Sequence, residues 1–376
     1  MDNAGATLAA AVTGAAALGF VPVAIHFDLF PILVEIGPSA TAEELTEAYN
    51  EGRDGGLGRH SPLCLRLTQD TMFVMAGLGL VDLVEEDTFS TNAVTRHMVS
   101  LPSALHGALH FTTEPLLASA FFMRKLFNSN FEYPFKETET PMQYAYEMMG
   151  EERLAKEHTY SIMHLQGRMD SFNIFMEGKF GKFGRMPERV KGFGYDLDAA
   201  ISGKESPVAV VDIGGGRGEM LLELKEAYPQ LQPQNLVLQE FNAEFQTVPE
   251  VTMMDWNFKD KPQPILGALN YSLTHIFHHL PDLDAMGLMQ RISTAMAPHS
   301  RLLIHEFSKN TNHGKMHATM IDLYAGRLRS GIEWRQMAAI AGLEITFEAY
   351  PMAGEGLVEM KKIQFGRDPV DHAFKS

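Results

Sequence analysis

The sequence of 376 residues contains a single cysteine, Cys64, and few basic residues for its number of acidic ones. One cysteine cannot form an intrachain disulfide, and it excludes a zinc site built from several cysteines. With 31 lysines and arginines against 47 aspartates and glutamates, the formal net charge is −16. This negative charge repels a phosphate backbone, so we expect no nucleic-acid partner. The lone cysteine fits a reducing compartment, and we expect a cytoplasmic protein.

Charged residues are also absent from the segment 8–27. Twenty such residues are enough to cross a bilayer. However, no basic residue precedes the segment, and Asp2 has the wrong sign for a signal peptide. Two glycines and a proline interrupt it as well. We therefore expect a helix that is buried or forms a dimer, and no membrane segment.

The length suggests two domains, or one with an appendage, at roughly 100–200 residues per domain. Within residues 1–105, a helix is expected at 40–49 with Thr41 as its N-cap. A second, apolar helix begins near residue 67 and breaks at two glycines, and a short hairpin follows up to residue 92. Helices with a small β-wing are typical of a winged helix. Because the second helix lacks arginine and lysine, we interpret 1–105 as a dimerisation module rather than a DNA-binding one.

Residues 106–200 are predicted to be mainly helical and are rich in phenylalanine and methionine. This composition favours a connector that contributes to a pocket for an apolar small-molecule substrate. Within it, 172–196 mixes aromatic, glycine and basic residues and is expected to be a connector or lid. His106, His110 and Met163 are candidate substrate contacts, although a purely structural role for the two histidines is the simpler interpretation.

From residue 207 onward, apolar strand-like segments alternate with helical ones. Strands are expected at 207–215, 235–240, 251–255, 267–273 and 301–306, with helices at 219–228, 283–297 and 333–341. This alternation predicts an α/β fold with a mostly parallel, doubly wound, Rossmann-like sheet over 201–376. Two late strands, 344–350 and 357–365, could form an antiparallel edge.

The segment VVDIGGGRG (210–218) ends the first of these strands. Its spacing, Gly214-x-Gly216-x-Gly218, is not the G-x-G-x-x-G of dinucleotide sites, and the sequence has no P-loop motif. In a doubly wound fold, ligands bind beyond the carboxyl ends of the strands. Glu240 ends the next strand, where a carboxylate can accept from both ribose hydroxyls. Asp255 ends the third strand, where it could accept from an adenine amino group.

Acids after three successive strands, without a phosphate-binding lysine, favour a nucleoside ligand that lacks pyrophosphate. S-adenosyl-L-methionine is such a ligand, and its sulfonium tolerates an acidic site. The alternative is a tight glycine turn with polar strand ends. The candidate cofactor-binding residues are Asp212, Gly214, Gly215, Gly216, Glu240, Asp255 and Trp256.

His278 and His279 follow the fourth strand and are expected at the start of the next helix, on the ligand-binding edge. A histidine there can act as a general base near neutral pH. Glu306, at the end of the fifth strand, could orient or charge-stabilise the imidazole. These three are the candidate catalytic residues. Because adjacent residues on a helix point apart, we expect no metal at the histidine pair.

Together these segments resemble the plant- and fungal-type small-molecule O-methyltransferases that use S-adenosylmethionine. LVEEDTFSTNAVTRHM is similar to their dimerisation domain, VVDIGGGRG to their cofactor loop, and YSLTHIFHHLPD to the segment that ends in His-Asp-Trp-Pro-Asp. The resemblance implies a homodimer in which His278 is the base and Glu306 is one of two flanking acids. It also implies that Gly214 and Gly216 hold the methionine part, Glu240 the ribose and Asp255 the adenine.

Two departures from the family pattern are present. The family's His-Asp-Trp is replaced by His278, His279 and Leu280, and Leu328 stands where the second flanking acid belongs. Fungal enzymes of this fold include pericyclases and dehydrating cyclases that keep the cofactor pocket. We therefore expect O-methylation of a phenolic or enolic secondary metabolite, with a pericyclase of polyketide-type metabolism as the alternative. A dimer that merely binds the cofactor is disfavoured because His278 and Glu306 are both retained.

Overall fold

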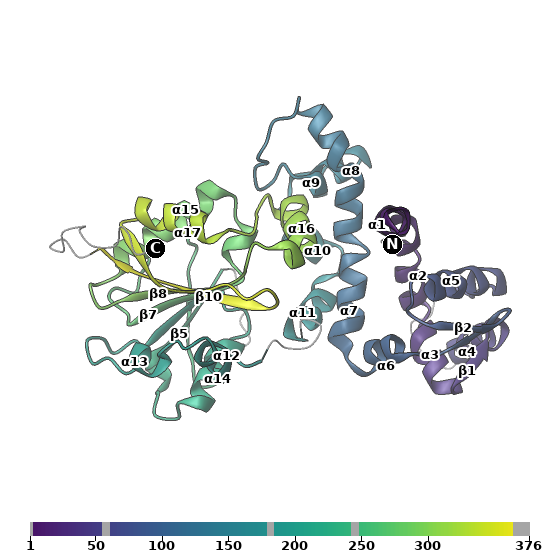
Figure 1. The fold of residues 1–376 in the computed structure, drawn as a ribbon, viewed down its shortest axis with the longest axis horizontal. Helices are drawn as coiled ribbons and strands as arrows, with labels where there is room; N and C mark the ends of the chain where they lie inside the picture. Colours follow the sequence, from purple (N-terminus) through teal and green to yellow (C-terminus); the bar gives the residue numbers. More distant parts are fainter. Residues whose placement is uncertain (1–2, 55–60, 179–183, 242–247, 364–376) are drawn as a thin grey trace. The chain divides into compact units, whose positions relative to one another are not determined.

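The computed structural model describes residues 3–54, 61–178, 184–241 and 248–363 (Figure 1). The chain divides into two compact units. The first consists of Met1–Glu132 and Thr138–Lys182, and the second of Tyr133–Glu137 and Phe183–Ser376. The segment predicted as a connector, 106–200, is thus divided between the units.

The first unit is mainly helical, with one small sheet. Its elements are α1 (Ala4–Leu18), α2 (Val21–His26), α3 (Leu29–Ile36), β1 (Ser39–Thr41), α4 (Ala42–Asp54), α5 (Leu65–Gly77), β2 (Asp82–Glu85), β3 (Thr88–Ser90), α6 (Ala93–Ser100), α7 (Pro102–Phe111), α8 (Glu114–Asn128), α9 (Pro141–Met148), η1 (Leu154–Lys156), α10 (Thr159–Leu165) and α11 (Met169–Gly178). Strands β1, β3 and β2 pair antiparallel in that order.

The expected N-cap and hairpin are both present in this unit. Thr41 Oγ1 accepts from Glu44 N at 3.1 Å, and Glu44 Oε2 accepts from Thr41 N at 2.7 Å. This reciprocal pair satisfies backbone donors at the start of α4. Helix α5 ends at Gly77, and β2 and β3 form the hairpin that follows. The apolar residues of α5 that face inward, Met72 and Met75, are fully buried in the core of this unit.

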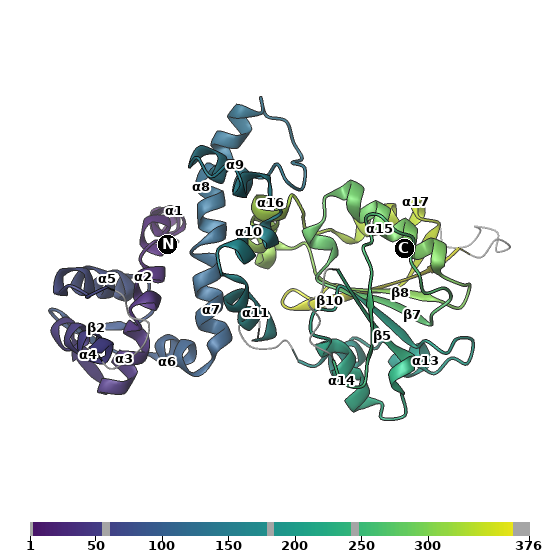
Figure 2. The same ribbon diagram turned by 180° about the vertical axis from the view of Figure 1, so that it is seen from behind.

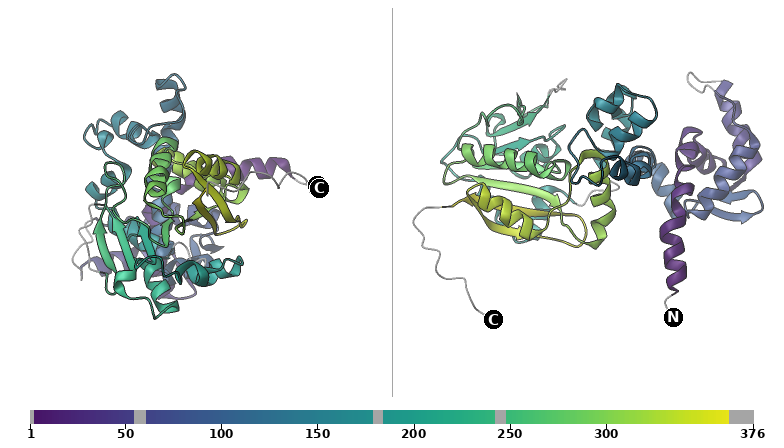
Figure 3. Two further views of the ribbon diagram at one scale, coloured as in Figure 1. Left: turned by 90° about the vertical axis from the view of Figure 1, so that its left-hand side faces the viewer. Right: turned by 90° about the horizontal axis from the view of Figure 1, so that it is seen from above.

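The expectation of a buried N-terminal helix is wrong for the chain by itself. Helix α1 projects from the rest of its unit (Figure 3, right), and Leu8 and Val12 are 64% and 62% exposed. The uncharged segment is instead divided into α1 and α2 near Gly19. A dimer-forming role for α1 stays a prediction. None of the helices in the described ranges has both the length and the apolarity needed to span a membrane.

The second unit is the predicted doubly wound domain. Its elements are α12 (Met186–Gly192), α13 (Leu197–Ile201), β4 (Val210–Ile213), α14 (Glu219–Ala227), η2 (Pro233–Asn235), β5 (Leu236–Glu240), β6 (Thr252–Asp255), β7 (Asn270–Thr274), η3 (Phe277–His279), α15 (Asp282–Ala295), β8 (Arg301–Phe307), η4 (Thr311–His313), α16 (Gly314–Tyr324), α17 (Gly331–Ile340), β9 (Leu343–Ala349) and β10 (Glu355–Lys362). Every strand expected from the sequence is present, with ends shifted by up to three residues.

The seven strands have the order β6-β5-β4-β7-β8-β10-β9. The first five are parallel, and β10 runs antiparallel between β8 and β9, which confirms the predicted antiparallel edge. Figure 1 shows α12, α13 and α14 on one face of the sheet and α15 and α17 on the other, and Figure 2 shows the same layers from behind. The chain order reverses between β4 and β7. Ligands of doubly wound sheets bind at such a switch point.

Candidate active site

The glycine loop leaves β4 at the switch point and is shaped by positive φ angles. Gly214 and Gly216 have φ of 68° and 59°, a region that costs little only for glycine. A Cβ on Gly214 would lie 2.5 Å from Ile276 Cδ1, so the loop packs directly against the turn that carries the histidines. Around Gly216, by contrast, a Cβ would meet nothing within 4 Å. The loop therefore offers open space at Gly216, next to the histidine turn.

Asp212 lies buried beneath this loop. A Cβ on Gly215 would approach its Oδ2 to 2.2 Å, and neither carboxylate oxygen has a hydrogen-bond partner in the described protein. Burial, followed by the negative charges of Glu240 and Glu219, raises the pKa of Asp212 to about 8. A buried acid without partners is costly, and a cationic ligand group near it would relieve that cost. A negative charge on Asp212 would thus suit a cationic ligand group, such as an ammonium, on the outer side of the loop.

The two other strand-end acids lie side by side. Glu240 and Asp255 are paired in the register of β5 and β6, and Asp255 is exposed. Glu240 is held in place by Gly216 N, which donates to its Oε2 at 2.9 Å, and by Phe241 N at 3.2 Å. Burial raises the pKa of Glu240, while these two backbone donors oppose the rise. The acids therefore present oxygen acceptors along one edge, as a nucleoside requires.

Trp256 is placed differently from the other cofactor candidates. Its indole is only 4% exposed and belongs to the apolar core between the sheet and α15. Its Nε1 donates to Pro262 O at 3.0 Å. The donor of the indole is thus already used within the protein.

His278 and Glu306 form a buried pair at the same edge of the sheet. His278 Nδ1 contacts Glu306 Oε2, and His278 N donates to Glu306 Oε1 at 3.2 Å. Both side chains are about 5% exposed. Burial opposes ionisation of Glu306, but the charge and hydrogen bonds of His278 outweigh it and hold the pKa of Glu306 below its ordinary value. This geometry orients the imidazole.

The two histidines do not begin a helix, and their rings do not point apart. They lie in the 3₁₀ turn η3, ahead of α15, and their Nε2 atoms are 3.1 Å apart. The tighter winding of η3 turns successive side chains differently from an α-helix. The ring of His279 also packs against Tyr324, at 4.5 Å between centroids. Within the described ranges, no group of three or more potential metal ligands is gathered.

The segment after α16 lies against this turn. A Cβ on Gly326 would come within 2.1 Å of His278 O, so the two backbones touch. Leu328, at the position where the resemblance led us to expect a second acid, is 1% exposed, and its backbone N donates to His317 Nδ1 at 3.2 Å. The sequence reasoning missed α16 and also the buried Arg329. The arginine pair in the run GRLRS (326–330) was a signal that could have drawn attention to it.

The candidate substrate residues all belong to the first unit. His110 is buried, lies 3.3 Å from Glu114 Oε2 and stacks on Phe175. His106 Nδ1 is 2.8 Å from Ser171 Oγ, and burial lowers its pKa. Met163 is fully buried beside the same aromatic cluster. These partners account for both histidines structurally, and their role in substrate binding stays a prediction.

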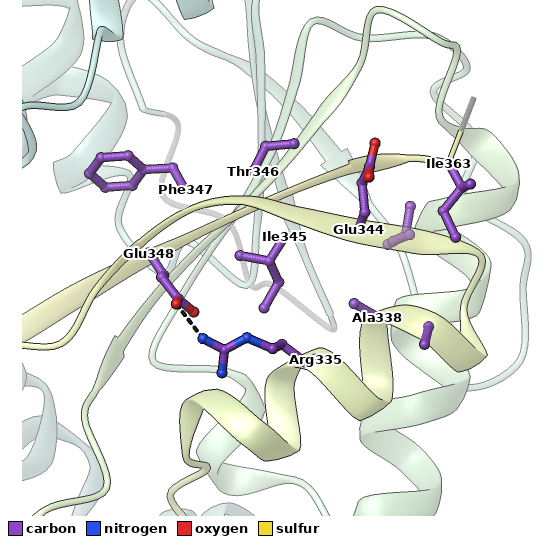
Figure 4. A pocket seen from close by; sticks show the side chains of 10 residues that line it. Arg335, Ala338, Glu344, Ile345, Thr346, Phe347, Glu348 and Ile363 are labelled. Carbon is purple, nitrogen blue, oxygen red and sulfur yellow. Dashed lines mark hydrogen bonds and ion pairs between the residues drawn. The ribbon is translucent and has the colours of Figure 1, made fainter. Parts of the chain in front are cut away.

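A groove of about 550 Å³ lies elsewhere, between α17 and the edge strand β9. Figure 4 shows Arg335 reaching across it to Glu348, with Ile345 and Ala338 between the two elements. None of the site residues predicted from the sequence lines it.

Comparisons with known proteins show what the chain is similar to. A family model described as an O-methyltransferase domain matches residues 204–344. The chain is 54% identical to "O-methyltransferase bfoE" of Aspergillus brasiliensis over 96% of this chain and 97% of that one. It is 52% identical to "O-methyltransferase aunE" of Aspergillus niger, with the same coverage.

Two solved structures share the fold over nearly the whole chain. OxaC in complex with sinefungin and meleagrin has a TM-score of 0.79 at 15% identity and covers 95% of this chain and 88% of its own. LepI in complex with SAM has a TM-score of 0.75 at 19% identity and covers 97% and 90%.

Proposed function

Because the chain belongs to the O-methyltransferase family, we propose that it methylates the oxygen of a phenol or enol with His278 as general base. The observation that carries this proposal is the buried His278–Glu306 pair, on a turn that packs against the glycine loop through Ile276. The base and the cofactor loop are thereby next to each other at the switch point of the sheet.

S-adenosylmethionine, when bound, supplies a methyl group made electrophilic by its sulfonium. Glu240 would accept from the ribose hydroxyls, since a carboxylate can accept more hydrogen bonds than the two that it receives from Gly216 and Phe241. Asp255 would accept from the adenine amino group. Asp212, beneath the loop, would stabilise the positively charged methionine part electrostatically, across the backbone of Gly214–Gly216.

The protein's own chemistry is proton removal. Glu306 can only accept when ionised, so the proton of neutral His278 is on Nδ1 and the lone pair is on Nε2. That lone pair takes the hydroxyl proton, and Glu306 stabilises the imidazolium that forms. General-base catalysis of this kind contributes about 10²–10⁴-fold to a rate.

For the substrate, we propose an apolar, aromatic small molecule of secondary metabolism. The aromatic cluster of the first unit supports this, since Met163, Phe172 and Phe175 are packed beside His110. For the assembly, we propose a homodimer in which the exposed, uncharged α1 is covered by the partner chain. An exposed helix with Leu8 and Val12 in water is unfavourable for a monomer.

Two observations support the alternative reaction, catalysed by a pericyclase. Leu328 replaces the second acid, and His279 contacts the lone pair that the base needs. A pericyclase would use the histidines to polarise a carbonyl instead of removing a proton.

The discriminating experiment uses S-adenosylmethionine labelled in its methyl group and a panel of phenolic and enolic polyketides. A labelled O-methyl product, absent with His278→Ala, supports the proposal. A rearranged or dehydrated product without label would favour the pericyclase. The panel should include each phenol as its methyl ether, which cannot accept the label and serves as the matched control.

A further inference from the structure

Arg329 is a charged side chain with no exposure to solvent, and it lies directly behind the histidine turn. The residue is 2% exposed, and its guanidinium is fully covered. Burial lowers the pKa of Arg329, while the charge of Asp282 opposes this. A buried cation is expensive unless its donors are satisfied. In the described protein, Nη1 and Nη2 of Arg329 have acceptors, whereas its Nε has none. The groups that accept hydrogen bonds from Arg329 therefore indicate which part of the chain it fixes.

Three acceptors of this guanidinium come from one short stretch of chain. Nη1 donates to Phe277 O at 2.6 Å, and Nη2 donates to Leu280 O at 3.0 Å and to Asp282 Oδ1 at 2.8 Å. The two carbonyls immediately flank His278 and His279 in the sequence. The planar fork of an arginine can bridge several acceptors in fixed directions, which a lysine cannot do.

Residues near Arg329 in the sequence also pack against the histidine turn or against the guanidinium. Gly326 lets the backbone touch the carbonyl of His278, and the ring of Trp334 lies 5.8 Å from the guanidinium carbon. The turn is also held where His278 N and Nδ1 meet Glu306, and where the ring of His279 packs on Tyr324. Glu306 thus contacts the His278 ring directly, while Arg329 binds the backbone carbonyls on either side of the histidine pair.

We propose that Arg329 is a positioning residue for the base: it fixes the 277–282 turn so that the His278 imidazole stays aligned with Glu306. The expected effect of Arg329 on the rate rests on the proposed function, whereas its effect on the alignment of His278 does not. The segment 326–330, in which Leu328 stands where an acid was expected, would therefore still contribute to the site, because Arg329 sets the geometry of the base.

The test compares Arg329→Lys with two matched controls. Arg327→Lys changes the neighbouring arginine, which binds the same Asp282 from the surface and touches neither carbonyl. Arg301→Lys changes a partly buried arginine at the opposite end of β8, where it pairs with Glu359. Each protein is measured with S-adenosylhomocysteine for affinity, with one accepted substrate for kcat and KM, and by proton NMR for the Nδ1–H of His278 in its bond to Glu306.

For Arg329→Lys we expect kcat to fall about tenfold to hundredfold, as for loss of a charged hydrogen bond. KM and the affinity for S-adenosylhomocysteine should stay within about twofold, because the glycine loop is not held by Arg329. The downfield Nδ1–H signal should shift or broaden only in this variant. Arg329→Met should give the same result more strongly, and if it fails to fold, Asp282→Asn takes its place as the second variant.

Two results would overturn the proposal. In one, Arg329→Lys keeps both kcat and the Nδ1–H signal. In the other, kcat, affinity and thermal stability decline together, as for a purely structural arginine. If no substrate is methylated by any variant, the proposed function fails, yet an altered signal confined to Arg329→Lys still supports the positioning role and an unaltered one still refutes it.

Discussion

The Nε2 atoms of His278 and His279 lie 3.1 Å apart, although the two residues are neighbours in the chain. Because ionised Glu306 accepts a hydrogen bond from the Nδ1–H of neutral His278, the Nε2 of His278 is an acceptor, and His279 is the donor in this contact. The lone pair that would remove a substrate proton is thus covered by a second imidazole. His279 must turn away from it when the substrate hydroxyl arrives.

The first prediction separates the roles of the two histidines. His278→Ala should lower kcat for methyl transfer by about 10²–10⁴-fold, the contribution of a general base. His279→Phe keeps a ring against Tyr324 but cannot cover the lone pair, and it should change kcat by less than about tenfold. Steady-state kinetics with one accepted phenol measures both. If His279→Phe is the inactive variant and His278→Ala is active, the base has been assigned to the wrong histidine.

The second prediction concerns Glu306. Glu306→Gln keeps the shape of the side chain but removes the charge that stabilises a protonated His278. A charged hydrogen bond is worth about 1.5–3 kcal/mol, so kcat should fall about tenfold to hundredfold. The matched control is Glu359→Gln, on the neighbouring strand β10, which pairs with Arg301 at the far end of the sheet. Equal losses in kcat for the two variants would mean that the loss reflects a general disturbance of the sheet and not a specific role of Glu306.

The third prediction tests the cofactor loop. Gly216→Val puts a side chain into the open space at the loop and should remove measurable binding of S-adenosylmethionine in calorimetry. Gly342→Val is the control, because Gly342 also has a positive φ of 70° and open surroundings but lies in the turn before β9. Both variants carry backbone strain of about 1–2 kcal/mol. Unchanged affinity in Gly216→Val would mean that the ligand lies elsewhere.

The fourth prediction follows from the raised pKa of Asp212. The folded protein keeps this proton up to about pH 8, whereas the unfolded chain loses it near pH 4. Between these values the folded state binds the extra proton, so the free energy of unfolding falls as pH rises, by about 1.4 kcal/mol per pH unit from this group. Asp212→Asn removes the titrating group.

Urea unfolding at several pH values between 5 and 8 measures the free energy of unfolding of the native protein and of Asp212→Asn, and the difference between the two isolates this effect. The free energy of unfolding of the native protein should fall relative to that of Asp212→Asn as pH rises. Curves that stay parallel over this range would show that Asp212 is ionised in the folded protein.

The fifth prediction concerns assembly. Light scattering at micromolar concentration should give about twice the chain mass of 41.8 kDa. Replacing Leu8 and Val12 together with glutamate should shift the protein toward monomer, since charge would be buried at the contact. Leu283→Glu is the control, because Leu283 is 88% exposed but lies on α15 of the second unit. A native protein that is monomeric at every concentration would exclude a role for α1 in a dimer.

Much of the second unit could be read from the sequence because its signals are local. Alternating apolar strands and helices indicated the parallel sheet, and the late strands indicated its antiparallel edge. The acids at strand ends were predictable for the same reason, since parallel strands end at one edge of the sheet. The capping pair of Thr41 and Glu44 was likewise visible in four consecutive residues.

Other features depended on contacts between distant segments or on local winding, and only the tertiary structure decided them. The sequence suggested that His278 and His279 point apart, but a 3₁₀ turn brings their nitrogens together. Segment 8–27 looked suited to burial, yet among the described residues Val21 and Ala24 of α2 are buried while Leu8 and Val12 of α1 are exposed. Arg329 lies 49 residues beyond Leu280, whose carbonyl it binds, so folding must bring the two together, and burial then strengthens the bond.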